Sequence, residues 1–230
     1  MSGARRRALL FVSLILVVVA IFAIAAIQRN ATSLAPRPPS QRPTLLLLTS
    51  LPLVFGESFA LDNGGSPVLT RLEQRYNVVP IGVADAASLR GHKLVLMAHP
   101  RAQPAEALVE LNQWVRDGGR VLLLADPMLS WDSARPIGDP LRPPPAFADT
   151  GLLGHWGVEL LAERAEDLPV ETPSPGMLAS KRCKVADGGF IARCKVGKGR
   201  ATIIADADFL NGGPKGLDLM TSELVRLERP

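Results

Sequence analysis

The chain has 230 residues, of which 47% are hydrophobic, 21% charged and 5% aromatic. This length fits one domain with attached segments, and the composition excludes a wholly disordered chain and a collagen-like repeat. The formal net charge of +4 arises from six arginines that precede the first acidic residue, Glu57. Without these six, 20 of the 26 basic residues remain, against 22 acidic residues. A duplex-binding face needs clustered Lys and Arg, and the one local cluster, at 181–200, equally fits a solvated hairpin, so no nucleic-acid partner is predicted.

A membrane-spanning segment is predicted near the N-terminus. Residues 8–27 contain no charged side chain, and 20 helical residues span about 30 Å, the thickness of one hydrocarbon core. Three arginines lie just before this segment and favour a cytoplasmic N-terminus of residues 1–7. We therefore expect a single-pass protein of the inner (cytoplasmic) membrane, with a Pro-rich tether over 28–43 and a periplasmic, extracytoplasmic domain over 44–230.

A cleaved signal peptide is the alternative interpretation of the N-terminal segment. Ala23-Ile24-Ala25 resembles a cleavage motif, although the apolar run is longer than the 7–15 residues or so that are usual in a signal peptide. Either interpretation delivers the domain to the extracytoplasmic side of the membrane.

Short apolar runs alternate with helical patterns through the first half of the domain. The run Thr44–Thr49 (TLLLLT) predicts a buried strand. A helix is expected over 66–75 and a second strand over 77–83, where Pro80 indicates an edge position because proline cannot donate to a sheet ladder. A third strand is expected over 93–98.

The strongest helical pattern covers residues 104–117. Its apolar residues recur at helical spacing on one face, and Gly118-Gly119 predicts the end of the helix. A fourth apolar strand is expected over 120–125. Strands that are apolar throughout, with helices between them, indicate a parallel sheet that is covered on both faces. The predicted fold class is therefore α/β, with a doubly wound, mostly parallel sheet.

The second half of the domain has a different pattern. Residues 126–147 hold six prolines and no periodicity, which predicts a long surface loop that can carry function. A strand is expected over 158–161, followed by another loop over 163–175. A buried strand over 200–205 precedes a closing helix, whose apolar residues begin at Leu217.

A β-hairpin with two facing cysteines is predicted near the C-terminus. The runs 182–186 and 190–195 flank a glycine pair, and a two-residue turn at 188–189 would place Cys183 opposite Cys194. In an oxidising compartment these two residues are candidates for a disulfide. One objection is that this turn makes them a hydrogen-bonded pair, which a disulfide disfavours unless a bulge shifts the count. The alternative is two small, half-buried strand residues.

Candidate binding residues gather where the predicted strands end. Ligands of doubly wound sheets bind beyond the carboxyl ends of the strands. Those ends supply six polar residues: Thr49, Ser50, His99, Asp126, Asp206 and Asp208. Trp131, in the loop at 126–147, is a candidate anchor for a partner, although packing of the loop onto its own domain explains it equally well. Such sheet edges are polar in any case, so these residues favour a binding edge over a catalytic centre.

Catalytic and cofactor-binding motifs are missing from the sequence. It has no Gly-x-Ser-x-Gly elbow, no P-loop and no dinucleotide-binding glycine pattern. No His-x-x-x-His or Cys-x-x-Cys pair occurs either, so neither a metal nor a cofactor is predicted. One alternative function is a solute-binding domain. The other is a metal-assisted or degenerate hydrolase that uses His99, Asp126, Asp206 and Asp208.

The segments KLVLMAHP and QPAEALVELNQWVRDGGRVLLLADP resemble the domain of GldG-type ABC-transporter auxiliary proteins. The later segment GRATIIADADFLNGG is similar to the same family, and residues 45–57 fit its opening strand and loop. The resemblance implies a class I glutamine-amidotransferase-like fold, related to flavodoxin-like sheets, without the amidotransferase Cys. It also implies an association with an ABC-type transport system.

These observations predict a non-enzymatic, membrane-anchored accessory protein. Its domain is expected to bind a partner protein or ligand through the carboxyl edge of the sheet and the loop at 126–147. The membrane and the permease or ATPase subunits of an ABC transporter are the expected partners. The chain itself has no ATP-binding motif.

Overall fold

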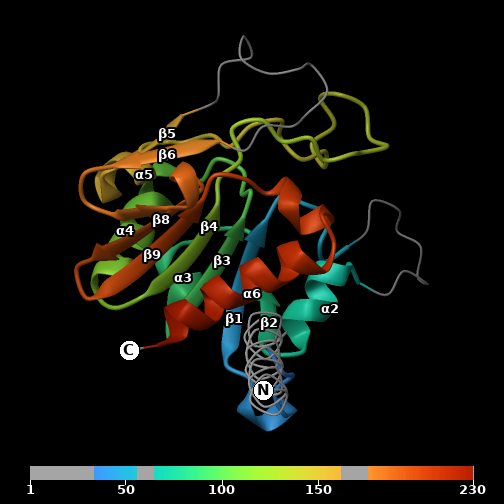
Figure 1. Cartoon of the computed structure of the whole chain (residues 1–230), viewed down its shortest axis with the longest axis horizontal. Coiled ribbons are helices and arrows are strands. Elements are labelled where there is room, and N and C mark those ends of the chain that lie inside the picture. The colour runs from blue at the N-terminus through green and yellow to red at the C-terminus, as the bar shows by residue number, and fades with distance from the viewer. Residues whose placement is uncertain (1–33, 56–64, 162–175, 230) are drawn as a thin grey trace, which may run out of the picture. The chain divides into compact units, whose positions relative to one another are not determined.

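A computed structural model of the chain describes residues 34–55, 65–161 and 176–229 (Figure 1). The chain divides into two units, 1–35 and 36–230, and all the helices and strands given below belong to the second. The expected cytoplasmic N-terminus and membrane segment, residues 28–33 of the expected tether and the loop at 163–175 lie outside the described residues. Within the described residues, no helix has the length and apolar character needed to cross a membrane.

In the described part of the chain, seven strands form one sheet in the order β2-β1-β3-β4-β9-β8-β7. The first five of these strands are parallel, and β8 and β7 extend the sheet as an antiparallel hairpin. The strands are β1 (Thr44–Thr49), β2 (Asn77–Pro80), β3 (Leu94–Ala98), β4 (Arg120–Leu124), β7 (Lys184–Ala186), β8 (Ile191–Val196) and β9 (Gly199–Ile204). The predicted mixed α/β class, with a mostly parallel sheet and a C-terminal hairpin, is confirmed.

Helices pack on both faces of this sheet. They are α2 (Pro67–Glu73), α3 (Ala86–Leu89), α4 (Ala105–Arg116), α5 (Leu152–Trp156) and α6 (Pro214–Glu228), with short 3-10 turns η1 (Pro39–Gln41), η3 (Asp187–Gly189) and η4 (Asp208–Asn211). Leu46 of β1 packs into a cluster with α3, α4 and α5, whereas its neighbour Leu47 packs into a second cluster with α2 and α6. This alternation explains the apolar strands, because each strand buries both of its faces.

The predicted elements agree with the structure where the sequence is strongly periodic. Strand β1 covers the predicted residues, and β2 is an edge strand, as Pro80 indicated. Helix α4 begins one residue later than predicted because Pro104 takes the N-cap position. Two elements were not predicted: α3, whose N-cap Asp85 accepts a hydrogen bond from Ser88 N at 2.8 Å, and β6 (Met177–Ser180), which pairs with β5 (Val158–Leu161) in a separate antiparallel sheet.

A disulfide joins Cys183 to Cys194 beside the β7–β8 hairpin. The glycine pair turns the chain as predicted, since Phe190 N donates to Asp187 O at 3.1 Å across residues 188 and 189, but the strands end earlier on each side, so that four residues, 187–190, connect them. Cys183 still faces Cys194, as predicted, since the residues next to them on the side of the turn, Lys184 and Arg193, pair with each other. The cysteine Cα atoms lie 4.4 Å apart, the spacing of a non-hydrogen-bonded pair, and the geometric objection therefore disappears.

Candidate functional site

The carboxyl ends of the parallel strands meet at one edge of the sheet, which we call the carboxyl edge. Chain order reverses between β1 and β3, and this is the type of position where α/β sheets bind ligands. Two hydroxyls there bond across to the neighbouring strand: Thr49 Oγ1 donates to Ala98 O at 2.9 Å, and Ser50 Oγ donates to His99 O. Since Thr49 Oγ1 also accepts from Leu51 N, the main role of these hydroxyls is to hold β1 and β3 together.

His99 is fully buried and has a left-handed backbone conformation, with φ of 45°. Its Nε2 lies 2.9 Å from Pro144 O, and it must carry the proton because a carbonyl oxygen only accepts. Nδ1 has no hydrogen-bond partner within the described residues. Burial lowers the pKa of His99, so the ring is neutral near neutral pH. The ring thus fastens the loop at 126–147 to the end of β3.

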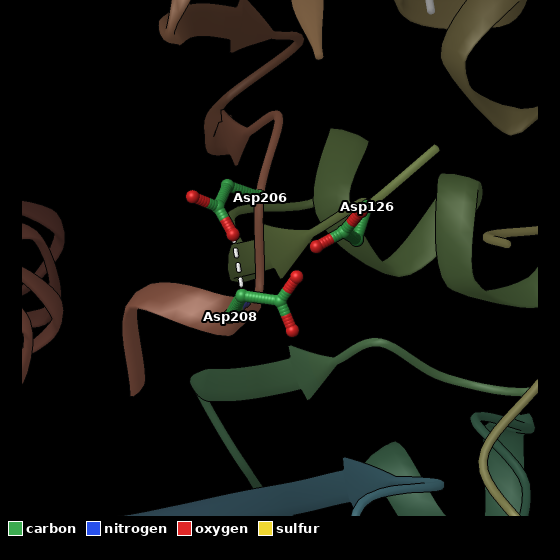
Figure 2. A group of neighbouring side chains, drawn as sticks. All are labelled: Asp126, Asp206 and Asp208. Atoms are coloured by element: carbon green, nitrogen blue, oxygen red, sulfur yellow. Dashed lines mark hydrogen bonds between the residues drawn. The ribbon is translucent and has the colours of Figure 1, made fainter. Parts of the chain in front are cut away.

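Three aspartates converge at the ends of β4 and β9 (Figure 2). One oxygen from each of Asp126, Asp206 and Asp208 lies within 4.8 Å of the others. We call these residues the aspartate cluster. The sequence analysis had grouped these three residues with His99 as possible metal ligands. The structure brings the three aspartates together, but His99 does not belong to this group of close ligand atoms.

Most carboxylate oxygens of the aspartate cluster already accept hydrogen bonds. Buried Asp126 accepts from Met128 N and Ala207 N, both at 2.8 Å. Asp206 Oδ1 accepts from Asp208 N at 2.6 Å, and Asp208 Oδ2 accepts from the amide and the hydroxyl of Ser130. Asp208 Oδ1 is buried and has no hydrogen-bond partner in the described part of the chain. The cluster therefore organises the start of the loop at 126–147 and leaves some coordinating capacity.

The electrostatics of the aspartate cluster are unfavourable when all its members are ionised. Burial, and then the nearby charge of Asp126, raise the pKa of Asp206 from 3.8 to about 6. Asp208 adds a smaller repulsion, which backbone hydrogen bonds to Asp206 partly offset. Asp206 is thus the member that takes up a proton in mildly acidic solution.

A cavity of about 280 Å³ opens at the carboxyl edge near β1 and β2. Thr49, Ser50 and Pro80 line it from the strands, while Arg135 and Leu141 line it from the loop at 126–147. The hydroxyls of Thr49 and Ser50 already bond to backbone carbonyls of the neighbouring strand. The rest of the cavity lining is mostly apolar, and Arg135 is its one cationic side chain among the described residues.

Exposed apolar side chains lie in the lining of this cavity, at Phe55 and Leu141, and elsewhere in the loop at 126–147, at Ile137; none of them was predicted as a binding residue. Ile137 is 93% exposed, Phe55 74% and Leu141 58%. Trp131, the predicted anchor, is instead partly buried against the cluster under α6. A signal was present in the sequence, since large apolar residues in a Pro-rich loop have no helical or strand periodicity that would bury them.

Comparisons with known proteins assign no family. Neither a protein-family model nor a curated protein matches the sequence. Similar solved structures include an exo-β-1,4-mannosidase from Opitutaceae bacterium strain TAV5, with 15% identity, a TM-score of 0.45, and coverage of 81% of this chain and 36% of that one. A β-galactosidase from Rahnella sp. R3 has 14% identity and a TM-score of 0.41, with coverage of 82% of this chain and 32% of that one. A cytoplasmic protein from Salmonella typhimurium LT2 has 13% identity and a TM-score of 0.44, with coverage of 81% of this chain and 100% of that one. The chain spans only about a third of the two glycosidases, and all three likenesses are too distant to assign an activity.

Proposed function

We propose that this chain is a non-enzymatic accessory protein of an ABC-type transport system, anchored in the cytoplasmic membrane by residues 8–27. Its extracytoplasmic domain binds a partner protein through the carboxyl edge and the loop at 126–147. The finer fold assignment, a doubly wound glutamine-amidotransferase-like sheet, belongs to the same proposal. It is supported by the order β2-β1-β3-β4-β9, which corresponds to the 2-1-3-4-5 order of flavodoxin-like sheets.

The observation that carries the binding role is the group of exposed apolar side chains in the lining of the cavity and in the loop that borders it. We call Phe55, Ile137 and Leu141 the apolar rim. Phe55 and Leu141 line the same cavity, and exposed apolar surface of this kind is costly in water and typical of an interaction site. The loop that carries two of its members is held by hydrogen bonds at both ends, since Phe147 N donates to Asp126 O at 2.7 Å and His99 holds Pro144. The rim is therefore presented by a supported loop, which limits the entropy lost when a partner binds.

The disulfide supports the proposed location. Disulfides persist in the periplasm and other oxidising compartments and are rare in the cytosol. The Cys183–Cys194 bond therefore agrees with export of the domain, which the arginines before the apolar segment also favour.

The test is crosslinking on intact membranes, followed by capture of the chain and identification of the proteins that accompany it. We expect an ABC permease or its ATPase to be recovered, and the double variant Ile137→Asp/Leu141→Asp to lower recovery at least about tenfold, the effect of losing one strong apolar contact. Val109→Asp is the matched control, because Val109 is 67% exposed on α4, outside the apolar rim. Equal recovery with the rim variant, or no transporter subunit with an exported and folded chain, would contradict the proposal.

A metal-assisted hydrolase is the second candidate, and the three close carboxylates favour it. Carboxylate oxygens are the ligands that Mg²⁺, Ca²⁺ and Mn²⁺ prefer. Equilibrium dialysis of the full chain against each ion tests this candidate. One bound ion per chain that is lost in Asp206→Ala, together with metal-dependent hydrolysis of an ester or a glycoside, would favour it over the accessory role.

A further inference from the structure

A strongly basic surface lies on the opposite side of the domain from the aspartate cluster, where the parallel strands begin. An open hollow of about 620 Å³ there is lined by strands β7, β8 and β9 and by the end of α6. No carboxylate lines it in the described part of the chain. Six cationic side chains do, and we call them the basic face: Lys184, Arg193, Lys195, Lys198, Arg200 and Arg226.

Sheet register places these cations beside one another. Lys184 is opposite Arg193 on β7 and β8, and Lys195 is opposite Arg200 on β8 and β9. Like charges on directly facing residues are destabilising, so this arrangement does not serve the stability of the isolated domain. It becomes favourable when several anionic groups lie against the face.

The carboxylate beside the basic face neutralises only part of its charge. Buried Glu223 of α6 accepts two hydrogen bonds from Arg193, at 2.6 and 2.8 Å, and lies 3.4 Å from Arg226. Lys184, Lys195 and Lys198 are exposed, and their ammonium groups make no hydrogen bond or ion pair with other described residues. These three ammonium groups are free to meet anions from solution.

The chain enters the domain beside this face. Arg37, the second residue of the unit that starts at residue 36, forms an ion pair with Glu228, two residues after Arg226. Arg200 Nη1 in turn donates to Arg229 O at 2.9 Å. The first residues of this unit and Arg200 of the basic face therefore contact the same end of α6.

We propose that the basic face binds the phosphate groups of an anionic phospholipid surface and holds this edge of the domain on the membrane. The proposal rests on the proposed anchoring of residues 8–27. Charge and position favour lipid over nucleic acid. No aromatic side chain lines the hollow in the described residues, whereas proteins that bind single strands stack bases on aromatic rings. Beyond the six N-terminal arginines, moreover, the chain has more acidic than basic residues.

The experiment uses the full chain in nanodiscs of phosphatidylcholine alone and of phosphatidylcholine mixed with phosphatidylglycerol. Amide hydrogen exchange of residues 193–200 is the readout. We expect slower exchange in the anionic discs, and recovery of the faster rate when salt is raised. Each Lys or Arg near an anionic surface contributes roughly fivefold in binding, so Lys195→Glu/Lys198→Glu should lose at least about 25-fold of the association and remove the protection.

A matched variant controls for net charge. Arg90→Glu/Lys215→Glu makes the same charge change at two exposed residues outside the basic face, and it should keep the lipid-dependent protection. Equal exchange in the two disc compositions would overturn the proposal, as would loss of protection in the control variant. Stronger protection by a single-stranded oligonucleotide than by anionic discs would also overturn it, in favour of nucleic acid.

Failure of the anchor is distinguishable from failure of the basic face. Comigration of the chain with discs of either composition reports insertion of residues 8–27. If the chain does not insert, the same full chain is floated with phosphatidylglycerol vesicles. Flotation that Lys195→Glu/Lys198→Glu abolishes would still support the basic face, and no flotation would refute it.

Discussion

Replacement of Asp206 by Asn should stabilise the domain near neutral pH. Asp206 has a pKa of about 6 in the folded chain, against 3.8 for an ordinary aspartate, because it is buried beside Asp126. The folded state therefore holds the proton more tightly than the unfolded chain. This contribution to stability is fully present below pH 3.8 or so and is lost as the pH rises through about 6.

The size of the effect follows from the difference in pKa. A rise of that size corresponds to about 3 kcal/mol if the site were fully shielded from water. Because Asp206 is partly exposed, screening reduces the expected value to about 1–2 kcal/mol. Asn keeps the Oδ1 acceptor for Asp208 N and removes the charge, so the variant should gain this amount at pH 7.5 and little at pH 4.

Urea unfolding of the full chain in detergent micelles, with a chelator present, measures this difference. Comparison of the two chains at each pH isolates Asp206 from His99, whose pKa is lowered and whose contribution to stability therefore falls as the solution becomes acidic. A divalent cation that binds the aspartate cluster should reverse the order at pH 7.5, because it would stabilise only the chain that keeps Asp206. An Asn variant that is less stable than the parent at pH 7.5 with chelator would refute the electrostatic reasoning.

Two further predictions concern the scaffold. Changing Cys183 and Cys194 to Ser should lower the free energy of unfolding by about 2–3 kcal/mol, since the bond closes a loop with a sequence separation of 11. Unfolding of the parent chain and the variant, with and without reductant, measures this difference. An unchanged unfolding midpoint would argue against the bond. Gly199→Ala should lower the free energy of unfolding by more than about 2 kcal/mol, because the added Cβ would lie 2.0 Å from Val115 O. Gly82→Ala is the control and should lower it much less, because no atom lies within 4 Å of the added Cβ. Equal thermal midpoints for these two variants would contradict the packing.

The sheet could be predicted because its strands are buried on both faces. Leu45 to Leu48 are buried without interruption, so the run TLLLLT carries a signal that no loop or amphipathic helix gives. The separate β5–β6 sheet could not be predicted in the same way. Its strand β6 has the alternating pattern of a half-exposed strand over only four residues, which is too short to distinguish from a loop.

The aspartate cluster could also be predicted, for a topological reason. Parallel strands end at the same edge, so Asp126 after β4 and Asp206 after β9 are neighbours once those strands pair. His99 shows the limit of this reasoning. It follows β3 at the same edge, but its ring turns to Pro144, whose position depends on the path of a loop without periodicity. The apolar rim was missed for the same reason, since nothing local in the sequence decides which loop residues stay exposed.

The two proposed surfaces lie at opposite ends of α6. This helix follows η4 beside the aspartate cluster and ends at Glu228 beside the basic face, and its 15 residues span about 22 Å. Substitutions this far apart act independently unless the fold itself changes. A chain held on the membrane by its basic face would turn the carboxyl edge away from the lipid, toward the extracytoplasmic parts of a neighbouring protein. Lipid contact and partner capture can therefore fail separately. Loss of capture in a basic-face variant that keeps its apolar rim would mean that orientation on the membrane, as well as direct contact, determines partner binding.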